Sequence, residues 1–341
     1  MKTFSIPRHY DASKADQVYK VDYKGLAEKA IAYKQAEGIT NSAMDKYKIA
    51  LMPIDEQITF GIPGFELFVQ NAPEDTKRLA EWLYRNFGRI TTIFPTMDTH
   101  TAMQIFHSLF FIDASGIPVA PNTVISSDDL TKGIYQVNPA VATALGVGYT
   151  TLTKHVLHYT QSLERNGKYS LIIWDYHAML GGIGHALIPL LEEAIFFHTQ
   201  VRNSQPGIEI KGGSPLTENY SVLSPEVLNT YDGSPIASKN ARFIEKLLNY
   251  DMVIIAGQAK SHCVAFSIED LLTEIQAKDP ALAKKVYLLE DCTSPVVIPN
   301  GPDFTDQGNQ AFERFRNAGM HLVKSTTPID QWPDVEVSKL V

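Results

Sequence analysis

The segment MVIIAGQAKSHCV, residues 252–264, joins an apolar run to a turn that contains a glycine and then to a helical pattern. Residues 252–256 are apolar at every position, which is typical of a strand buried on both faces of a parallel sheet. A helix-like segment follows at residues 264–277. A buried strand that leads into a helix is the repeating unit of α/β folds, so this segment predicts that fold class.

Similar apolar runs recur along the chain, with helix-like segments between them. The runs lie at residues 49–54, 90–94, 170–174, 286–289 and 320–323, with a weaker one at 207–210. The helix-like segments lie at residues 75–86, 186–201, 240–249 and 307–317. This alternation predicts a layered α/β domain whose mainly parallel sheet is joined by crossover helices.

Two regions lack this alternation. Residues 1–47 contain a helical pattern at 23–35 but no strand, and residues 113–168 begin with turn formers and become helix-like at 150–165. We interpret the first region as an N-terminal extension and the second as a helical insertion at about 113–168 in one domain that spans 48–341. A length of 341 residues would suggest about two domains, but a large α/β sheet can form a single domain of this length.

Composition and charge limit the class of protein. Hydrophobic residues make up 44% of the chain and charged residues 20%, as in globular proteins. The net charge of −8 argues against a nucleic-acid partner. No apolar run reaches the roughly 18 residues of a membrane span, and the first residues lack the apolar core of a signal peptide. The chain has two cysteines, too few for a disulfide scaffold. Together, these features lead us to expect a cytoplasmic protein with no membrane partner.

Reactive side chains follow the apolar runs. In open α/β sheets, ligands bind beyond the carboxyl ends of the strands. The residues at these expected ends are Asp55, Asp98, His100, His177, Lys211, Cys263, Asp291 and Cys292. Carboxylates, a lysine, a thiol and two histidines at one sheet edge predict a catalytic site.

Cys263 is the candidate nucleophile, because it lies where a strand turns into a helix. Unpaired N–H groups at a helix N-terminus favour the thiolate, and Lys211 would favour it further. An aspartate within reach could take up the thiol proton. The alternative is that Cys263 is a buried small hydrophobic residue, the usual role of a single cysteine. We interpret Cys292 in that structural way, since no comparable turn surrounds it.

Asp98 and His100 are candidate metal ligands. Residues two apart on an extended segment share a face, and with His177 they offer one carboxylate and two imidazoles to a divalent cation. The alternative is a group of hydrogen-bonded histidines beside an acid. His107 and His185 are further candidates, although each fits a packing role.

Five sequence blocks, in this order, resemble the nicotinamidase/pyrazinamidase branch of the isochorismatase-like cysteine hydrolases. The blocks are IDEQITF, TMDTH, WDYHAMLGGIGHAL, IKGGSPLTENYS and AGQAKSHCV. The resemblance extends from about residue 49 to residue 323, interrupted at 113–168. It implies a three-layer α/β/α fold with a mainly parallel central sheet.

The resemblance also implies a role for each matched residue. The implied catalytic residues are Asp55, Lys211 and Cys263. The implied oxyanion hole consists of the N–H groups of Ala259 and Cys263, with a cis peptide between Gln258 and Ala259. The implied substrate contacts are Phe60, Trp174 and Tyr220. The implied ligands of one divalent metal ion (zinc, or alternatively manganese or iron) are Asp98, His100 and His177.

The activity that the resemblance implies is hydrolysis of nicotinamide to nicotinate and ammonia through a thioester, in pyridine nucleotide salvage. Members of the family commonly form oligomers, which adds a homo-oligomer as a candidate assembly. The chain departs from the family pattern at Lys260 and Ser261, where threonine and aspartate are usual, and at Asp175, where proline is usual. A histidine that usually follows the Asp-x-His motif has no clear match here, and His107 is a candidate for a displaced version of it.

Three alternatives remain open at this point. The first is an amidase of the same family that acts on another small amide or on an N-carbamoyl substrate. The second is an iron-dependent oxygenase built on two histidines and one carboxylate, although its usual antiparallel barrel disagrees with the helical segments here. The third is a non-enzymatic scaffold that keeps the fold, against which the intact Asp55, Lys211 and Cys263 argue.

Overall fold

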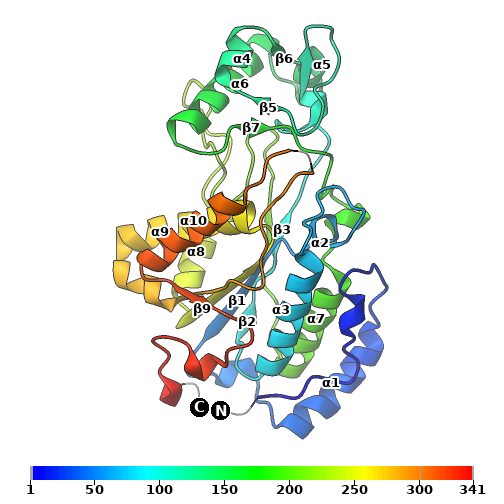
Figure 1. The fold of residues 1–341 in the computed structure, drawn as a ribbon, viewed down its shortest axis with the longest axis vertical. Helices are drawn as coiled ribbons and strands as arrows, with labels where there is room; N and C mark the ends of the chain where they lie inside the picture. Colours follow the sequence, from blue (N-terminus) through cyan, green and yellow to red (C-terminus); the bar gives the residue numbers. More distant parts are fainter. Residues whose placement is uncertain (1–2, 300, 340–341) are drawn as a thin grey trace.

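A parallel sheet forms the middle layer of the computed structural model, which describes residues 3–299 and 301–339 (Figure 1). The strand order is β11-β10-β9-β1-β2, and every neighbouring pair runs parallel. β1 pairs with β9 along its whole length, from Ile49 opposite Met252 to Ile54 opposite Gly257. The strands are β1 (Ile49–Ile54), β2 (Thr92–Ile93), β9 (Met252–Gly257), β10 (Val286–Leu289) and β11 (His321–Val323).

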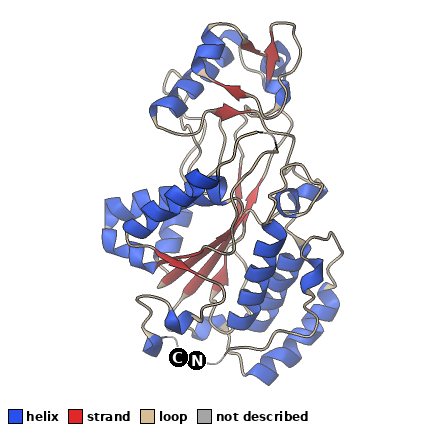
Figure 2. Cartoon of the chain, viewed as in Figure 1, coloured by secondary structure: helices blue, strands red, loops and turns tan. Residues whose placement is uncertain are grey.

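Helices cover both faces of this sheet (Figures 1 and 2). One face packs against α3 (Ala72–Asn86) and α7 (Pro189–Arg202), with α1 (Tyr23–Glu37) on the outer side of α7. The other face packs against α8 (Ala241–Leu248), α9 (Ala265–Lys278) and α10 (Thr305–Asn317). Neighbouring residues of β1 point to opposite layers: Leu51 joins the apolar cluster of α3 and α7, whereas Met52 joins that of α8, α9 and α10. The three-layer α/β/α fold is therefore confirmed.

Two expected strands lie outside the central sheet. The run at residues 170–174 contributes only β7 (Leu171–Ile172), which pairs antiparallel with β5 (Val124–Ile125). The weaker run contributes β8 (Glu209–Lys211), which pairs parallel with β3 (Thr96–Asp98) in a separate ladder. The placement of residues 170–174 in the parallel sheet was wrong because an apolar run indicates burial and not which strand will pair with it.

The chain between β3 and β7 builds the upper lobe in Figure 1. Besides helices, this lobe contains the antiparallel pair β4 and β6, which the sequence pattern did not predict. Leu152 and Val156 of α6 belong to the same apolar cluster as Met52 of the central sheet. The lobe consists of β4 (Phe111–Asp113), β5, α4 (Ser127–Thr131), β6 (Tyr135–Val137), α5 (Pro139–Leu145) and α6 (Tyr149–Arg165).

The N-terminal region packs along the outer side of α7 through α1, the helix expected at residues 23–35. The Asp22 side chain caps α1 by accepting a hydrogen bond from the N–H of Gly25. The guanidinium of Arg202, at the end of α7, is fully buried and donates to Asp45 at 2.5 Å. Since a buried ion pair is costly to break, this contact fixes the segment before β1 against α7.

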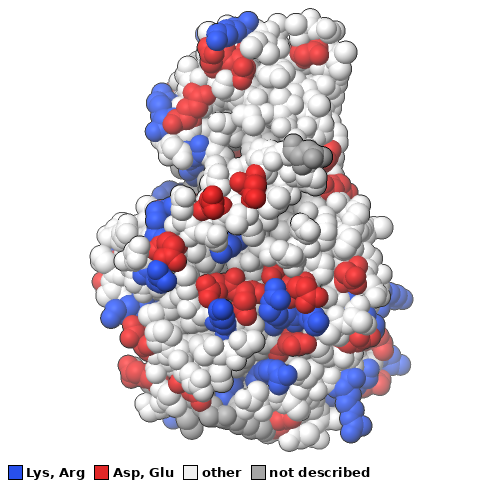
Figure 3. Space-filling view, in the orientation of Figure 1, with Lys and Arg blue, Asp and Glu red and all other residues white. Residues whose placement is uncertain are grey.

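The surface in Figure 3 carries acidic and basic side chains side by side, most densely in a band across the middle of the molecule. On this face neither sign of charge forms one continuous area. Within residues 3–299 and 301–339, no helix has the length and apolar composition needed to cross a membrane.

Leu51→Ala should lower the free energy of unfolding by about 3 kcal/mol, because Leu51 is fully buried and truncation leaves a cavity. Urea unfolding followed by circular dichroism measures this change. Ile31→Ala, at an exposed position of α1, is the control and should change stability by less than about 0.5 kcal/mol. Equal effects of the two substitutions would contradict the assigned core.

Candidate active site

The carboxyl ends of four strands meet and bring the expected catalytic residues together. Asp55 directly follows β1, Asp98 ends β3, and Lys211 ends β8 at the position paired with Asp98. Cys263 lies in a π-helical turn, Lys260–Val264, between β9 and α9. All four side chains are buried.

The ammonium group of Lys211 is at the centre of this cluster. Its Nζ lies 3.0 Å from Oδ2 of Asp55 and 3.0 Å from Oδ1 of Asp98. It donates a hydrogen bond of 2.7 Å to the carbonyl of Asn219 and lies 3.5 Å from Sγ of Cys263. Residues 55, 98, 211 and 263, far apart in the sequence, therefore share one set of contacts.

Burial and charge act against each other on the titratable groups of this cluster. Burial raises the pKa of Cys263 well above its usual range, while Lys211 acts to lower it. Burial also raises the pKa of Asp55, again opposed by Lys211. For Asp98, burial acts to raise the pKa, but Lys211 and His100 outweigh it, so that the pKa is lowered. The lysine thus favours the ionised forms of the thiol and both carboxyls.

The backbone around Asp55 is closely fixed. Asp55 has a φ of 46°, which is uncommon for a residue other than glycine. Its N–H donates to Oγ1 of Thr96 at 3.0 Å, and the Thr96 hydroxyl donates to Oδ1 of Asp55 at 2.5 Å. These two bonds hold the carboxylate in place, with its Oδ2 toward Lys211.

Gly257 joins β9 to the turn that carries Cys263. Its φ is 113°, and a Cβ at this position would lie 2.1 Å from the carbonyl oxygen of Ile54, the residue before Asp55. Only glycine allows the two backbones to approach so closely. The peptide bond between Gln258 and Ala259 is cis, as the sequence resemblance implied. The N–H of Ala259 makes no hydrogen bond to the described residues.

Three histidines form a group that could hold a metal ion. A ring nitrogen from each of His100, His107 and His177 lies within 4.8 Å of the other two, and all three residues are buried. Nδ1 of His100 and Nε2 of His107 have no hydrogen-bond partner among the described residues, whereas Nε2 of His100 lies 2.6 Å from Oδ1 of Asp98. Nδ1 of His177 donates to the carbonyl of Asp175 at 2.7 Å, which leaves its Nε2 as the lone-pair nitrogen. A group of imidazole nitrogens that face one another in this way fits a divalent cation such as zinc.

This group differs from the expected ligand set in one member. His107, which the sequence left as a candidate, belongs to the group, whereas Asp98 lies 2.6 Å from Nε2 of His100 and also contacts Lys211. His185 lies outside the group and pairs with the Thr99 hydroxyl at 2.8 Å. The loop between β3 and β4 brings His107 beside His100, a contact that sequence spacing did not predict.

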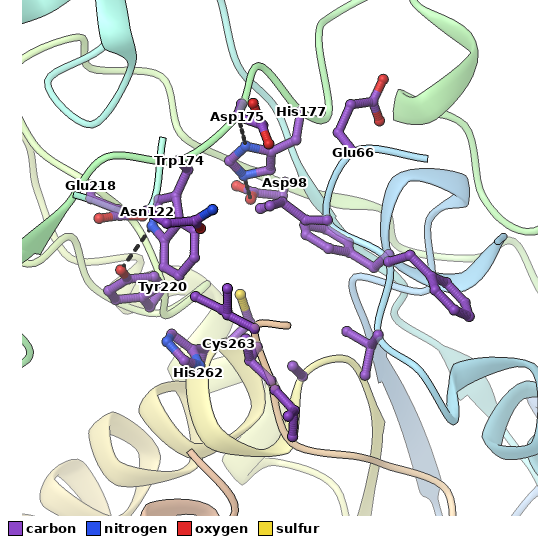
Figure 4. A pocket seen from close by; sticks show the side chains of 18 of the residues that line it. Glu66, Asp98, Asn122, Trp174, Asp175, His177, Glu218, Tyr220, His262 and Cys263 are labelled. Atoms are coloured by element: carbon purple, nitrogen blue, oxygen red, sulfur yellow. Dashed lines mark hydrogen bonds and ion pairs between the residues drawn. The ribbon is translucent and has the colours of Figure 1, made fainter. Parts of the chain in front are cut away.

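A cavity of about 260 Å³ opens beside Cys263 (Figure 4). The three expected substrate contacts, Phe60, Trp174 and Tyr220, all line it. Trp174 donates from Nε1 to the hydroxyl oxygen of Tyr220 at 3.1 Å, which fixes both rings. The cavity therefore places aromatic surfaces next to the thiol, as a flat ring substrate would require.

Several lining residues were not singled out from the sequence. Glu218 lies two positions before Tyr220, and His262 lies directly before Cys263. Their closeness to these motif residues is the one sequence feature that could have indicated their place in the cavity. Asn122 comes from the upper lobe, and residues 296–299 come from the loop after β10. Nothing in the sequence pattern of these last two segments indicated a place in the cavity.

Comparison with known proteins yields structural matches alone. No protein-family model matches the chain, and no curated protein matches it. Among solved structures, the chain shares its fold with nicotinamidases. The nicotinamidase/pyrazinamidase of Acinetobacter baumannii is 19% identical, with 82% of this chain and 97% of that chain covered and a TM-score of 0.50. Yeast nicotinamidase bound to the inhibitor nicotinaldehyde is 18% identical, with coverages of 81% and 99% and a TM-score of 0.50. At these identities the likeness establishes the fold.

Lys211→Met should slow alkylation of Cys263 by iodoacetamide at least about tenfold at pH 8, because loss of the ammonium disfavours the thiolate. Mass spectrometry of the modified peptides measures the rate. Cys292, which is fully buried, serves as an internal control and should stay unmodified in both proteins. An unchanged rate at Cys263 would contradict the electrostatic role of Lys211.

His107→Ala should weaken zinc binding at least about tenfold, because it removes one of three candidate imidazole ligands. Titration with a competing chelator measures the affinity. His185→Ala, which changes a histidine outside the group, is the matched control and should bind zinc as the unmodified protein does. If Asp98→Asn abolishes binding and His107→Ala leaves it intact, the set of Asp98, His100 and His177 is the correct one.

Proposed function

We propose that the protein is a metal-containing cysteine amidohydrolase that converts nicotinamide, a small aromatic carboxamide, into nicotinate and ammonia. The observation that carries this proposal is the position of Lys211, whose Nζ contacts the carboxylates of Asp55 and Asp98 and lies 3.5 Å from the thiol of Cys263. The fold shared with two nicotinamidases supports the substrate class.

In the proposed reaction, Cys263 passes its thiol proton to Asp55, and the sulfur forms a bond to the amide carbon. The C–N bond breaks as Asp55 returns the proton to the nitrogen, so ammonia leaves and a thioester remains. A water molecule then gives a proton to Asp55, and the oxygen of this water attacks the thioester carbon. The C–S bond breaks, the sulfur recovers the proton, and the carboxylic acid is released.

The negative oxygen of each tetrahedral intermediate needs hydrogen-bond donors that are already in position. We assign this role to the N–H groups of Ala259 and Cys263, which belong to the tightly held turn after β9. Loss of one such donor costs about 3 kcal/mol of transition-state stabilisation in other enzymes.

Aromatic side chains orient the substrate ring in this proposal. Phe60 and Trp174 line the cavity as flat surfaces, and Tyr220 supports Trp174 through its hydrogen bond. His100, His107 and His177, with Asp98 beside them, would hold the divalent metal ion. When bound, the metal would supply a Lewis-acid contact for the ring nitrogen of the substrate, which orients the amide carbon toward Cys263.

The purified protein should release ammonia from nicotinamide, and Cys263→Ala should reduce the rate at least about 1,000-fold, because the nucleophile is lost. A coupled glutamate dehydrogenase assay measures the ammonia. Cys292→Ala is the matched control and should retain activity, since Cys292 lies outside the cavity.

Two other results would redirect the proposal. Ammonia release from other amides but not from nicotinamide would keep the reaction and change the substrate. No release from any amide or N-carbamoyl compound, by protein that binds metal, would support a non-enzymatic role and overturn the proposal.

A further inference from the structure

Glu218 is a buried carboxyl group in the wall of the cavity. It comes from the segment between β8 and α8, is 5% exposed, and lines the cavity with Trp174 and Tyr220. Figure 4 shows it beside these two rings, on the opposite side of the cavity from Glu66. The proposed reaction assigns no role to this group.

No cation of the described chain pairs with the Glu218 carboxyl. The nearby lysines are engaged elsewhere: Lys211 contacts Asp55 and Asp98, and Lys168 lies 2.8 Å from the neighbouring Glu226. None of the described residues that line the cavity is lysine or arginine. Burial, Glu226 and Asp98 raise the pKa of Glu218 well above its usual range, opposed by Lys211 and by a hydrogen bond with Tyr220. Because no cation of the described residues pairs with it, the protein alone favours the protonated form of this carboxyl group.

The rest of the cavity also suits a cation. Asp175 and Glu66 are exposed carboxylates that line it, and Trp174, Tyr220 and Phe60 present aromatic rings. A narrow site lined by charges of one sign concentrates ligands of the opposite sign. The faces of aromatic rings attract ammonium groups, most strongly when water is excluded.

We propose that, among amides related to nicotinamide, the cavity prefers those that carry an additional positively charged nitrogen on the part of the molecule away from the carboxamide, and that Glu218 binds this nitrogen. A ligand ammonium would favour the ionised form of the carboxyl group and would form a charge-assisted hydrogen bond with it. A neutral ligand offers no such contact. The inference rests on the proposed function and adds a preference for charge among its substrates.

Three nicotinamide derivatives test this selectivity. They carry an aminomethyl, a hydroxymethyl or a carboxylate group on the ring carbon meta to the carboxamide, so that charge varies more than size. For the unmodified protein, kcat/KM for the aminomethyl compound should exceed that for the hydroxymethyl compound at least about tenfold. Glu218→Gln should bring the ratio of the two close to one. Glu193→Gln, which changes a buried acid of α7 outside the cavity, is the matched control and should preserve the ratio.

Binding to Cys263→Ala protein separates this inference from the proposed function. Calorimetry should show the aminomethyl compound binding at least about tenfold more tightly than the hydroxymethyl compound, whether or not the unmodified protein hydrolyses either. Equal affinities would overturn the inference. Tighter binding of the hydroxymethyl or carboxylate compound would also overturn it, because Glu218 would then act as a protonated acid that donates a hydrogen bond to the ligand oxygen. Thermal melting and metal content of each variant exclude loss of folding as the cause.

Discussion

The contact of one lysine ammonium with two carboxylates and a thiol is the interaction on which the site depends. Burying an ionised group is costly unless an opposite charge lies close to it. Lys211 lies 3.0 Å from a carboxylate oxygen of both Asp55 and Asp98, and 3.5 Å from Sγ of Cys263. Asp98 also lies 2.6 Å from Nε2 of His100. The electrostatics of the acid, the thiol and the histidine group are therefore linked.

The fold and most of the candidate site could be predicted from the sequence, for reasons that particular residues illustrate. Runs such as residues 49–54 and 252–256 are apolar throughout, which indicates strands covered on both faces, and both are central strands of the sheet. Asp55, Asp98 and Lys211 were expected at the edge of one parallel sheet, and they do meet, although Asp98 and Lys211 end the separate parallel pair of β3 and β8. The partner of β7 could not be predicted, since pairing with β5 depends on how residues 111–172 fold. His107 and Asn122 reach the site through loop conformations that no periodicity encodes.

The cavity is assembled from parts with different structural constraints. Hydrogen bonds between paired strands fix the backbone at or close to the candidate catalytic residues Asp55, Lys211 and Cys263. Asn122 and residues 296–299 lie on connections, which tolerate substitution better than strands do. The wall of the cavity therefore combines residues next to the strands with residues on the lobe and on loops.

Gly257 has a consequence for how the reacting groups keep their spacing. The strand that leads to the sulfur touches the strand that leads to the acid through main-chain atoms, with no side chain between them. Exchanges among leucine, isoleucine and methionine in the helical layers therefore do not change the distance between these two strands. The spacing between the segments that carry Cys263 and Asp55 is thus set by contact between main-chain atoms, so the surrounding helical layers can vary in sequence without changing it.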